Sequence, residues 1–325
     1  MKRGLAVAVV DPLSLLGRDI QAVLKERGFP FSKLHLFHTE NEPGNLLIDD
    51  GNEAAFVAPL TPEALEDCQI AFLCGSPYGT TRFLKARPPG PCVLIDLTGG
   101  RSGAFVRPDE PLPDGNVLVT HDPTAFVLAD VLRLLAGLAT LSGVSATVDR
   151  PVSDLGKAAL DELFDQAMSL AVFRPVPKKI LGTQAAFNIF TPPDSEAFEA
   201  TVVEDVGRLL GHLEKPIPVR VISARAGVFH GHLIRLEARF EGAAPGAAAI
   251  RDAFTRAPAY ELVDAENLSG PVECAGRDET LVLRVSSEGG AARLTLCSDH
   301  LRRPGALLAV RIAEQLVLER GLLAI

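Results

Sequence analysis

The run of small apolar residues from Val7 to Val10 is the feature that most constrains the fold of this chain. Four consecutive apolar residues followed directly by a turn are typical of a parallel strand that is buried on both faces. In many α/β proteins such a strand leads into a glycine-rich turn that holds a pyrophosphate at the N-terminus of the next helix, and about three glycines are usual there. Here the turn reads DPLSLLG over residues 11–17, with a single glycine. The sequence therefore predicts the strand, turn and helix of a nucleotide-binding fold without most of the phosphate-binding glycines.

Strands and helices alternate along the first part of the chain. A helix is predicted near 14–27, where apolar residues recur at helical spacing, and a short strand near 34–37 precedes a polar hairpin region that runs to about 58. Three more apolar runs, at 69–75, 92–97 and 116–120, predict buried strands. Strands separated by crossovers form a parallel sheet covered on both faces, so we expect an α/β, Rossmann-like domain over 1–122.

The pattern changes at about residue 123. Asp122 can cap a strong helix that starts at Pro123, because proline suits the first helical position. Other helices are predicted near 155–170, 196–211 and 245–256. Between and after them lie stretches that alternate apolar and polar residues, as in a sheet with one covered face, at 218–229, 232–241, 279–286 and 292–299. We therefore expect a second, α+β domain with a mixed or antiparallel sheet over 123–304, and a C-terminal helix over 305–325 that completes the first domain.

The charge pattern and the cysteines exclude several classes of function. The formal net charge of −9 is spread without clustered Lys and Arg, so we expect no nucleic-acid partner. No apolar run reaches the length of a membrane span, and the first residues lead into a strand rather than a signal peptide. Five cysteines without metal-ligand spacing or a CxxC pair indicate buried, reduced thiols. These features favour a cytoplasmic globular protein.

Four stretches, taken in order, resemble the aspartate-β-semialdehyde dehydrogenase family across nearly the whole chain. They are VAVV…LLGRDIQAVLKERGFP at the start, GTQAAFNIF at 182–190, RAGVFHGHLIRLEARFE at 225–241 and SDHLRRPGALLAVRIAEQL at 298–316. The resemblance implies an NADP-binding Rossmann-like domain and a second domain through which members dimerise. It also implies an oxidoreductase of amino-acid biosynthesis, in which a cysteine thiolate forms a thioester, a histidine acts as acid and base, and arginines hold the substrate.

Some site residues of the family have counterparts here. Arg225 matches the carboxylate-binding arginine, and His232 matches the acid/base histidine, here as a vestigial catalytic group. A guanidinium fits a carboxylate with two parallel hydrogen bonds, and an imidazole titrates near neutral pH. Gln184 matches as a substrate-binding residue, and Arg101, after the strand at 92–97, is expected to join Arg225 in a basic pocket. The resemblance thus implies a site for a small anion.

The residues that carry the family's chemistry differ. The catalytic cysteine of the family's NPNCS motif falls on Pro123, whose side chain cannot act as a nucleophile. Thr124, the next residue, has no obvious base and is expected to be a first-turn helix residue. The glutamine of the family's QAVSGAG loop falls on Arg150, and that loop reads RPVSDLG here. The asparagine that contacts the nicotinamide falls on Leu308, so we predict no dehydrogenase activity.

The cofactor loop also departs from the family's GATGxVG motif. Gly17, which lets the helix pack closely on the strand, is retained, and Ser14 stands in the degenerate loop. Pro12 removes an N–H donor, and Asp11 places a carboxylate beside the position of the pyrophosphate. Two like charges a few ångströms apart in a partly dry cleft cost on the order of a few kcal/mol. We therefore expect that no cofactor binds tightly, although the resemblance implies NADP.

We predict a catalytically degenerate member of the family, a homodimer that retains a pocket for a small anion. One alternative is an active oxidoreductase with relocated chemistry. In that alternative Cys74, at the end of a sheet strand, is the nucleophile, whereas the simpler interpretation is a packing cysteine.

A second alternative is a divalent metal site, although no tight ligand motif is present and none is therefore predicted. The ligands of that alternative are His230, His232, His121, Asp122 and Asp149. His212 and His300 carry no signal beyond that of ordinary surface or interface histidines.

Overall fold

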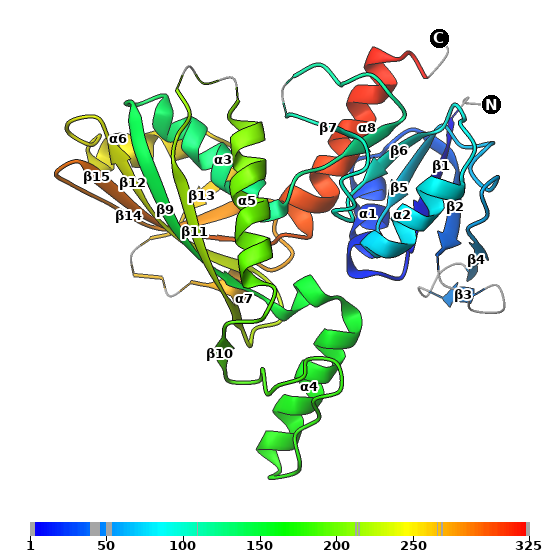
Figure 1. Ribbon diagram of the computed structural model, residues 1–325, viewed down its shortest axis with the longest axis horizontal. Coiled ribbons are helices and arrows are strands. Elements are labelled where there is room, and N and C mark those ends of the chain that lie inside the picture. Colours follow the sequence, from blue (N-terminus) through cyan, green and yellow to red (C-terminus); the bar gives the residue numbers. More distant parts are fainter. Residues whose placement is uncertain are drawn as a thin grey trace. The chain divides into compact units, whose positions relative to one another are not determined.

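The computed structural model describes residues 4–39, 46–49, 54–108, 110–211, 213, 215–264, 266–267 and 269–322 (Figure 1). The chain divides into two compact units, which we describe separately. The first unit is Met1–His121 with Gly305–Ile325, and the second unit is Asp122–Pro304.

The described part of the first unit is built on an eight-stranded sheet in the order β3-β4-β2-β1-β5-β6-β8-β7. Neighbouring strands are parallel except in the β3–β4 hairpin. The elements are β1 (Leu5–Val10), α1 (Leu15–Glu26), β2 (Phe31–His38), β3 (Leu46–Asp49), β4 (Ala54–Pro59), β5 (Ile70–Leu73), α2 (Pro77–Ala86), β6 (Val93–Asp96), β7 (Ala104–Phe105), β8 (Val117–Val119) and α8 (Leu308–Glu319). The predicted parallel, Rossmann-like sheet is confirmed.

The opening strand β1 contributes to two cores at once. Val7 and Val9 belong to the apolar cluster formed with α1 and α8, whereas Ala8 and Val10 belong to the cluster that includes Phe83 of α2. Each face of the strand is therefore covered by a different helix layer, which is why β1 is apolar at every position.

The second unit is built on a seven-stranded mixed sheet, in its described residues, in the order β10-β11-β9-β12-β15-β14-β13. The pairs β9–β11 and β13–β14 are parallel and the other pairs are antiparallel. The elements are α3 (Pro123–Ala136), β9 (Leu141–Arg150), a 3-10 turn called η1 (Val152–Leu155), α4 (Lys157–Ala171), β10 (Ile189–Phe190), α5 (Ser195–Leu209), β11 (Val219–Ala226), β12 (His232–Phe240), α6 (Ala247–Thr255), β13 (Tyr260–Leu262), α7 (Pro271–Cys274), β14 (Thr280–Glu288) and β15 (Ala291–Ser298).

Helices cover one face of this second sheet. α5 packs on β11, α6 packs on β14, and α3 contacts both helices (Figure 1). Along β12 the residues from His232 to Phe240 are buried at every second position, while Arg235 and Arg239 are exposed. The alternation predicted from the sequence thus marks the covered face.

Asp122 begins helix α3 in the way that the sequence predicts. Its carboxylate accepts hydrogen bonds from the backbone N–H groups of Thr124 at 2.8 Å and Ala125 at 3.3 Å, and Pro123 occupies the first helical position. Burial raises the pKa of Asp122, although these hydrogen bonds favour the ionised form. The cap fixes the first turn of α3, and therefore fixes where Thr124 lies.

All five cysteines are buried and none forms a disulfide. In the described part of the chain, no helix combines the length and the apolar character that crossing a bilayer requires.

Candidate functional site

Three strands of the second sheet end side by side and carry polar side chains on the covered face. Arg150 is the last residue of β9, and the parallel register places it opposite Arg225 of β11. β12 runs antiparallel to β9, so its first residue, His232, lies at the same edge. All three side chains are buried, and Arg225 is only 1 % exposed. Groups of this kind are rarely buried without partners, so their contacts define the candidate site.

One carboxylate, that of Asp154 in η1, joins these side chains. Its Oδ1 lies 2.8 Å from Nε2 of His232. Its Oδ2 accepts from Nε of Arg150 at 3.0 Å and from Nη1 of Arg225 at 3.2 Å. Burial alone raises the pKa of Asp154, but His232, His300 and Arg225 outweigh burial and hold the pKa well below its usual range. Asp154 is therefore ionised at neutral pH.

The sequence held a signal for Asp154 that motif matching missed. In the predicted match to the family's QAVSGAG loop, Arg150 falls on the glutamine and Asp154 on a glycine. Arg150 and Asp154 carry opposite charges four residues apart, and the structure pairs them. Two opposite charges that appear together in one short loop indicate an ion pair, because a buried charge is stable only with a partner.

His300 lies against His232, so the prediction of an ordinary surface or interface histidine is wrong. Their rings stack with centroids 4.9 Å apart, and Nε2 of His300 lies 3.4 Å from Oδ1 of Asp154. Burial, opposed in part by Asp154, lowers the pKa of His300 to about 4, so the ring is neutral at neutral pH. No local pattern marks this histidine, because the pairing of His232 with Ser298 across β12 and β15 brings it into place.

The hydroxyl of Thr124 contacts the other nitrogen of His232. Thr124 Oγ1 lies 2.9 Å from Nδ1 of the imidazole, and Thr124 is completely buried. The prediction that Thr124 has no obvious base is therefore wrong. Pro123 is the first residue of α3 and offers no nucleophilic atom, and its match to the family's cysteine stays a prediction. A hydroxyl, one residue later, is the group that faces the imidazole.

Arg225 has the largest side chain that is fully buried among the described residues. Its Nη1 donates to the carbonyl oxygen of Pro151 at 2.7 Å as well as to Asp154. Its Nε and Nη2 have no hydrogen-bond partner within the described residues, and Nη2 lies 3.9 Å from Oδ2 of Asp194. Burial lowers the pKa of Arg225 from its usual value, but a guanidinium stays charged in proteins. Two of its nitrogens are thus left to donate to a ligand.

Arg150 is fixed by contacts on several sides. Its Nη1 donates to Asp194 at 3.2 Å, and its guanidinium lies 3.8 Å from the ring centroid of Phe198. Together with Asp154, these contacts fix the position of the Arg150 guanidinium.

Gln184 makes contacts within its own turn. Its side-chain amide donates to the carbonyl oxygen of Ala186 at 3.2 Å, and its backbone carbonyl accepts from Nδ2 of Asn188 at 2.9 Å. Phe187, in the same turn, has a φ of 59°. These bonds stabilise a tight turn, and substrate binding by Gln184 stays a prediction.

In the first unit, the Asp11 side chain occupies the edge at which sheets of this type bind nucleotides. Its Oδ1 accepts from the backbone N–H of Thr39 and its Oδ2 from the Thr39 hydroxyl, each at 2.8 Å. A Cβ on Gly75 would clash with Oδ2, so the carboxylate presses against the end of β5. Asp11 has a φ of 59°, a conformation that favours glycine, as in the family's motif. Asp11 thus links the ends of β1, β2 and β5.

Ser14 and Gly17 both serve the start of helix α1. Ser14 Oγ accepts from the N–H of Gly17 at 2.9 Å and donates to the carbonyl oxygen of Asp11 at 2.8 Å. A Cβ on Gly17 would clash with the backbone of Asp11 and Pro12, so only glycine lets the helix begin this close to the strand. Cofactor binding by Ser14 and Gly17 stays a prediction.

Cys74 is a packing residue in this structure. It is buried in the first core, and burial together with Asp11 and Asp96 raises its pKa well above the usual value. A thiol that stays protonated is a poor nucleophile, so its environment does not support relocated chemistry at Cys74.

Arg101 lies over the ring of Phe105 in the first unit, with its guanidinium carbon 5.0 Å from the ring centroid. That Arg101 joins Arg225 in a basic pocket stays a prediction.

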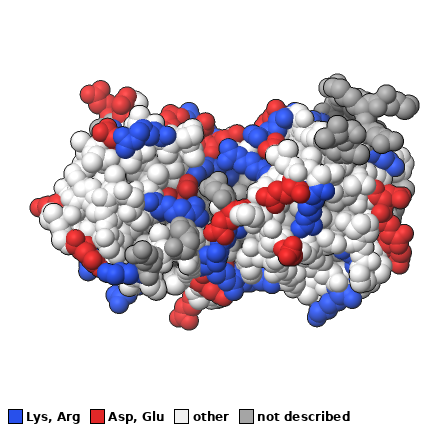
Figure 2. All heavy atoms as spheres, turned by 90° about the horizontal axis from the view of Figure 1, so that it is seen from above, with Lys and Arg blue, Asp and Glu red and all other residues white. Residues whose placement is uncertain are grey.

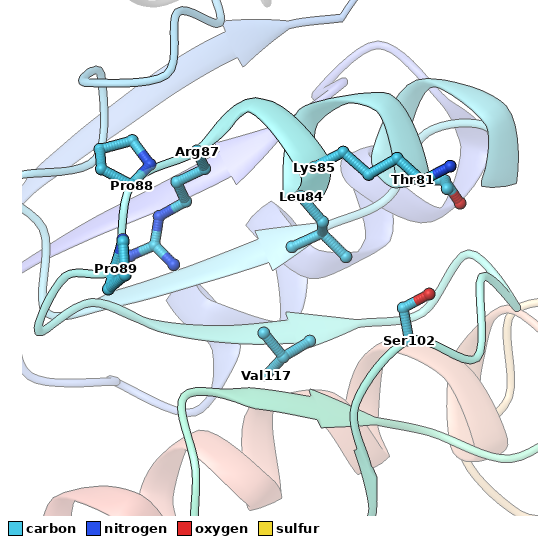
Figure 3. Close-up of a pocket in the computed structure, with 8 residues that line it drawn as sticks. All are labelled: Thr81, Leu84, Lys85, Arg87, Pro88, Pro89, Ser102 and Val117. Atoms are coloured by element: carbon cyan, nitrogen blue, oxygen red, sulfur yellow. The ribbon is translucent and has the colours of Figure 1, made fainter.

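A cavity of about 350 Å³ lies in the first unit beside α2 and β8 (Figure 3). Its basic residues are Lys85 and Arg87, and Arg87 donates to the carbonyl oxygen of Cys92 at 3.2 Å. The lining residues are Thr81, Leu84, Lys85, Arg87, Pro88, Pro89, Ser102 and Val117. This lining contains none of the predicted site residues.

The residues of the alternative metal site have other contacts. Asp149 accepts from an arginine of β12 at 2.7 Å, Asp122 caps α3, and His121 stacks on an aromatic ring of the first unit. His212 lies outside the described residues. Among the residues of the alternative metal site, His232 is the one that belongs to a cluster of metal-ligating side chains in the described part of the chain.

Charged side chains are mixed on the face that Figure 2 shows. Lys and Arg lie close to Asp and Glu, with uncharged areas between them.

This chain is similar to known proteins in sequence as well as in fold. A family model described as semialdehyde dehydrogenase, dimerisation domain, matches residues 132–303. An aspartate-semialdehyde dehydrogenase of Rickettsia bellii is 26% identical over 339 residues, which cover 96% of this chain and 97% of the relative.

Two solved structures share the fold. Aspartate semialdehyde dehydrogenase II from Vibrio cholerae, complexed with ASA, has a TM-score of 0.87 at 21% identity and covers 98% of this chain and 99% of its own. Aspartate semialdehyde dehydrogenase with NADP from Candida albicans has a TM-score of 0.72 at 13% identity, and the match covers 96% of this chain and 98% of the Candida chain. Because the matching family model spans more than half of this chain, the chain belongs to the semialdehyde dehydrogenase family.

Proposed function

We propose that this protein is a member of the family that has lost the dehydrogenase reaction and uses the remaining site to bind a small anion. The observation that carries the proposal is the buried guanidinium of Arg225, whose Nε and Nη2 have no hydrogen-bond partner among the described residues. Leaving buried donors unpaired costs about 1–3 kcal/mol each, so a ligand that accepts from both is stabilised there. A carboxylate or a phosphate oxygen pair fits this fork.

The loss of the dehydrogenase reaction follows from the groups at two positions. Pro123 replaces the thiol that the family uses, and the imidazole of His232 faces the hydroxyl of Thr124 instead. A hydroxyl has a much higher pKa than a thiol and forms no thioester.

The edge of the first sheet does not fit NADP. The carboxylate of Asp11 bridges the strand ends through Thr39 and carries a negative charge where the cofactor's phosphates are expected. Pro12 lacks the N–H that a phosphate-binding turn donates. We therefore propose that NADP, the family's cofactor, binds this chain weakly.

We also propose a homodimer formed through the second unit. Phe164, Met168 and Val172 stand four residues apart along α4 and its C-cap, and each is more than half exposed. A helix normally keeps such a stripe against a core, so this stripe fits burial by another protein surface. The neighbouring Phe173 is almost fully exposed. The description of the matching family model as a dimerisation domain supports a second copy of the chain as that surface.

The test of the anion site is a titration calorimetry and thermal-shift series with phosphate, sulfate, citrate and aspartate. The parent is expected to bind at least one of them at millimolar concentration or tighter. Arg225→Ala should weaken binding by roughly 10- to 150-fold, since a charge-assisted hydrogen bond is worth about 1.5–3 kcal/mol. Arg220→Ala is the matched control, because Arg220 is exposed on the same strand. Equal responses of the two variants would contradict the proposal.

The test of the lost reaction is phosphate-dependent reduction of NADP with aspartate semialdehyde. We expect no turnover, and Pro123→Cys alone should not restore it because the cofactor loop is also changed. A turnover of about one per second, within the usual enzyme range, would show that the reaction is retained.

A second candidate function rests on the contact between Thr124 and His232. In it Thr124 Oγ attacks an activated acyl carbon, His232 takes the hydroxyl proton, the leaving group departs with its bonding electrons, and water then hydrolyses the ester. The test is release of phosphate from an acyl phosphate, which Thr124→Val should abolish. Thr124 and Arg225 are both buried, so burial does not separate the two functions, and the unpaired nitrogens of Arg225 favour the anion-binding function.

A further inference from the structure

Three metal-ligating atoms converge at the buried edge of the second sheet. Asp154 Oδ1 lies 2.8 Å from Nε2 of His232 and 3.4 Å from Nε2 of His300, and the ligating atoms of all three residues lie within 4.8 Å of one another. The three residues come from η1, from the start of β12 and from the loop after β15. They are far apart in the sequence, and the fold of one unit brings them together.

The donor set is one that transition-metal sites use. Zinc takes imidazole nitrogens at about 2.0–2.1 Å and carboxylate oxygens at about 2.0–2.2 Å. Two such ligands at an angle between square and tetrahedral are roughly 2.9–3.4 Å apart. The two separations to Asp154 Oδ1 are close to this range, and the widest separation in the group, up to 4.8 Å, has to shorten when the ion binds. We propose that Asp154, His232 and His300 bind one zinc ion, with a further coordination position for an exogenous ligand.

The surroundings orient each of these ligands. The Nδ1 of His232 lies 2.9 Å from the Thr124 hydroxyl, and such a contact to the remote nitrogen fixes the tautomer of a ligating imidazole. The two arginines at the strand ends hold Oδ2 of Asp154, so that Oδ1 is the oxygen turned to the imidazoles. The Nδ1 of His300 has no hydrogen-bond partner within the described residues and lies 3.9 Å from Oδ1 of Asp299.

Charge balance links this site to an anion. The guanidiniums of Arg150 and Arg225 are matched by the carboxylates of Asp154 and Asp194, so a zinc ion adds two positive charges to a group that is already balanced. An anion at the remaining coordination position restores the balance. This step rests on the proposed anion site, and it makes zinc and the anion bind with positive coupling, in which each raises the affinity of the other by the same factor.

The experiment is calorimetry of the full chain, stripped with a chelator and dialysed, against zinc chloride alone. We expect about one zinc per chain with a micromolar or tighter dissociation constant. His300→Asn should weaken binding at least 100-fold, whereas His230→Asn, two residues before His232 and outside the cluster, should bind as the parent does. Melting curves of each variant establish that it is folded. If His300→Asn fails to fold, cobalt(II) bound to the parent replaces that comparison, because three protein ligands and one exogenous ligand give intense tetrahedral visible bands.

Absence of zinc binding by the parent, or equal binding by His300→Asn and His230→Asn, overturns the proposal. Hexa-aqua-like cobalt bands in the parent overturn it as well. A second titration with sulfate, with and without zinc, separates the two proposals. Sulfate that binds more tightly with zinc supports the coupling. Sulfate that binds equally without zinc leaves the anion site standing and overturns the coupled metal site.

Discussion

Asp154 Oδ1, in the 3-10 turn η1, lies 2.8 Å from Nε2 of His232. A carboxylate at this point contacts the imidazole and at the same time pairs with the guanidiniums of Arg150 and Arg225. His232 therefore lies within a network of buried charges, and the first two predictions concern that network.

Asp154→Asn should lower the free energy of unfolding by about 3–5 kcal/mol at neutral pH, because breaking a buried ion pair leaves charges without partners. The pKa of Asp154 is held low in the folded protein, so its contribution is present above about pH 4, the usual pKa of an aspartate, and is lost as the pH falls further. Urea unfolding of parent and variant between pH 8 and pH 3 measures the difference. The difference in unfolding free energy should be constant down to about pH 5 and shrink below about pH 4. Asp161→Asn, at an exposed ion pair with Lys157, is the control and should change stability by less than about 0.5 kcal/mol.

His300 should make the protein less stable in mild acid. Its pKa is lowered to about 4 in the folded protein, whereas an unfolded histidine titrates near pH 6.5. Between these two values the unfolded chain binds a proton that the folded protein does not, so the stabilising contribution is complete above pH 6.5 and falls as the pH drops toward 4. The loss attributable to this residue is on the order of 2–3 kcal/mol. In chelator-treated protein, His300→Gln should flatten the fall in unfolding free energy over this range, and His230→Gln, which removes only the smallest of the charge effects on His300, should change it far less.

Removal of the Asp11 carboxylate should improve cofactor binding. The parent is expected to bind NADP and NAD no more tightly than about 1 mM, which corresponds to about 4 kcal/mol. Asp11→Gly, alone or with Pro12→Ala, removes the charge and suits the positive φ, so calorimetry should show at least a tenfold gain. Asp67→Gly, at an exposed aspartate of the same unit, should show no gain. A micromolar dissociation constant for the parent would contradict the role assigned to Asp11.

The exposed stripe on α4 should control the oligomeric state. Phe164→Glu with Met168→Glu places charges in the proposed interface, where an unpaired charge is costly, and should convert a dimer into a monomer. Light scattering coupled to gel filtration measures the mass directly. Val272→Glu, at another exposed apolar residue of the same unit, should leave the mass unchanged. A parent that is already monomeric at micromolar concentration would count against the homodimer.

Local patterns predicted the elements that depend on local physics. The all-apolar strand β1 and the capped start of α3 follow from side-chain burial and from the Asp122-Pro123 pair, and both appear where the sequence places them. The alternating stretches likewise predicted the covered face of the second sheet, because every second residue of β12 is buried.

The site could be predicted only in part. Motif matching placed Arg225 and His232, and the structure brings both to one edge of the sheet. Thr124 and His300 were missed because their contacts with His232 depend on helix placement and strand register, which no local pattern encodes. Asp154 was the residue with a readable signal, since its charge appears together with that of Arg150.

The facing positions of Arg150 and Arg225 on parallel strands also decide which charges this loop can carry alone. An arginine at 150 without a carboxylate at 154 leaves Asp194 to serve two guanidiniums, whose repulsion costs roughly 3 kcal/mol at a separation of about 5 Å. An aspartate at 154 without an arginine at 150 still has Arg225 and His232 as partners. The loop should therefore tolerate the aspartate without the arginine better than the arginine without the aspartate.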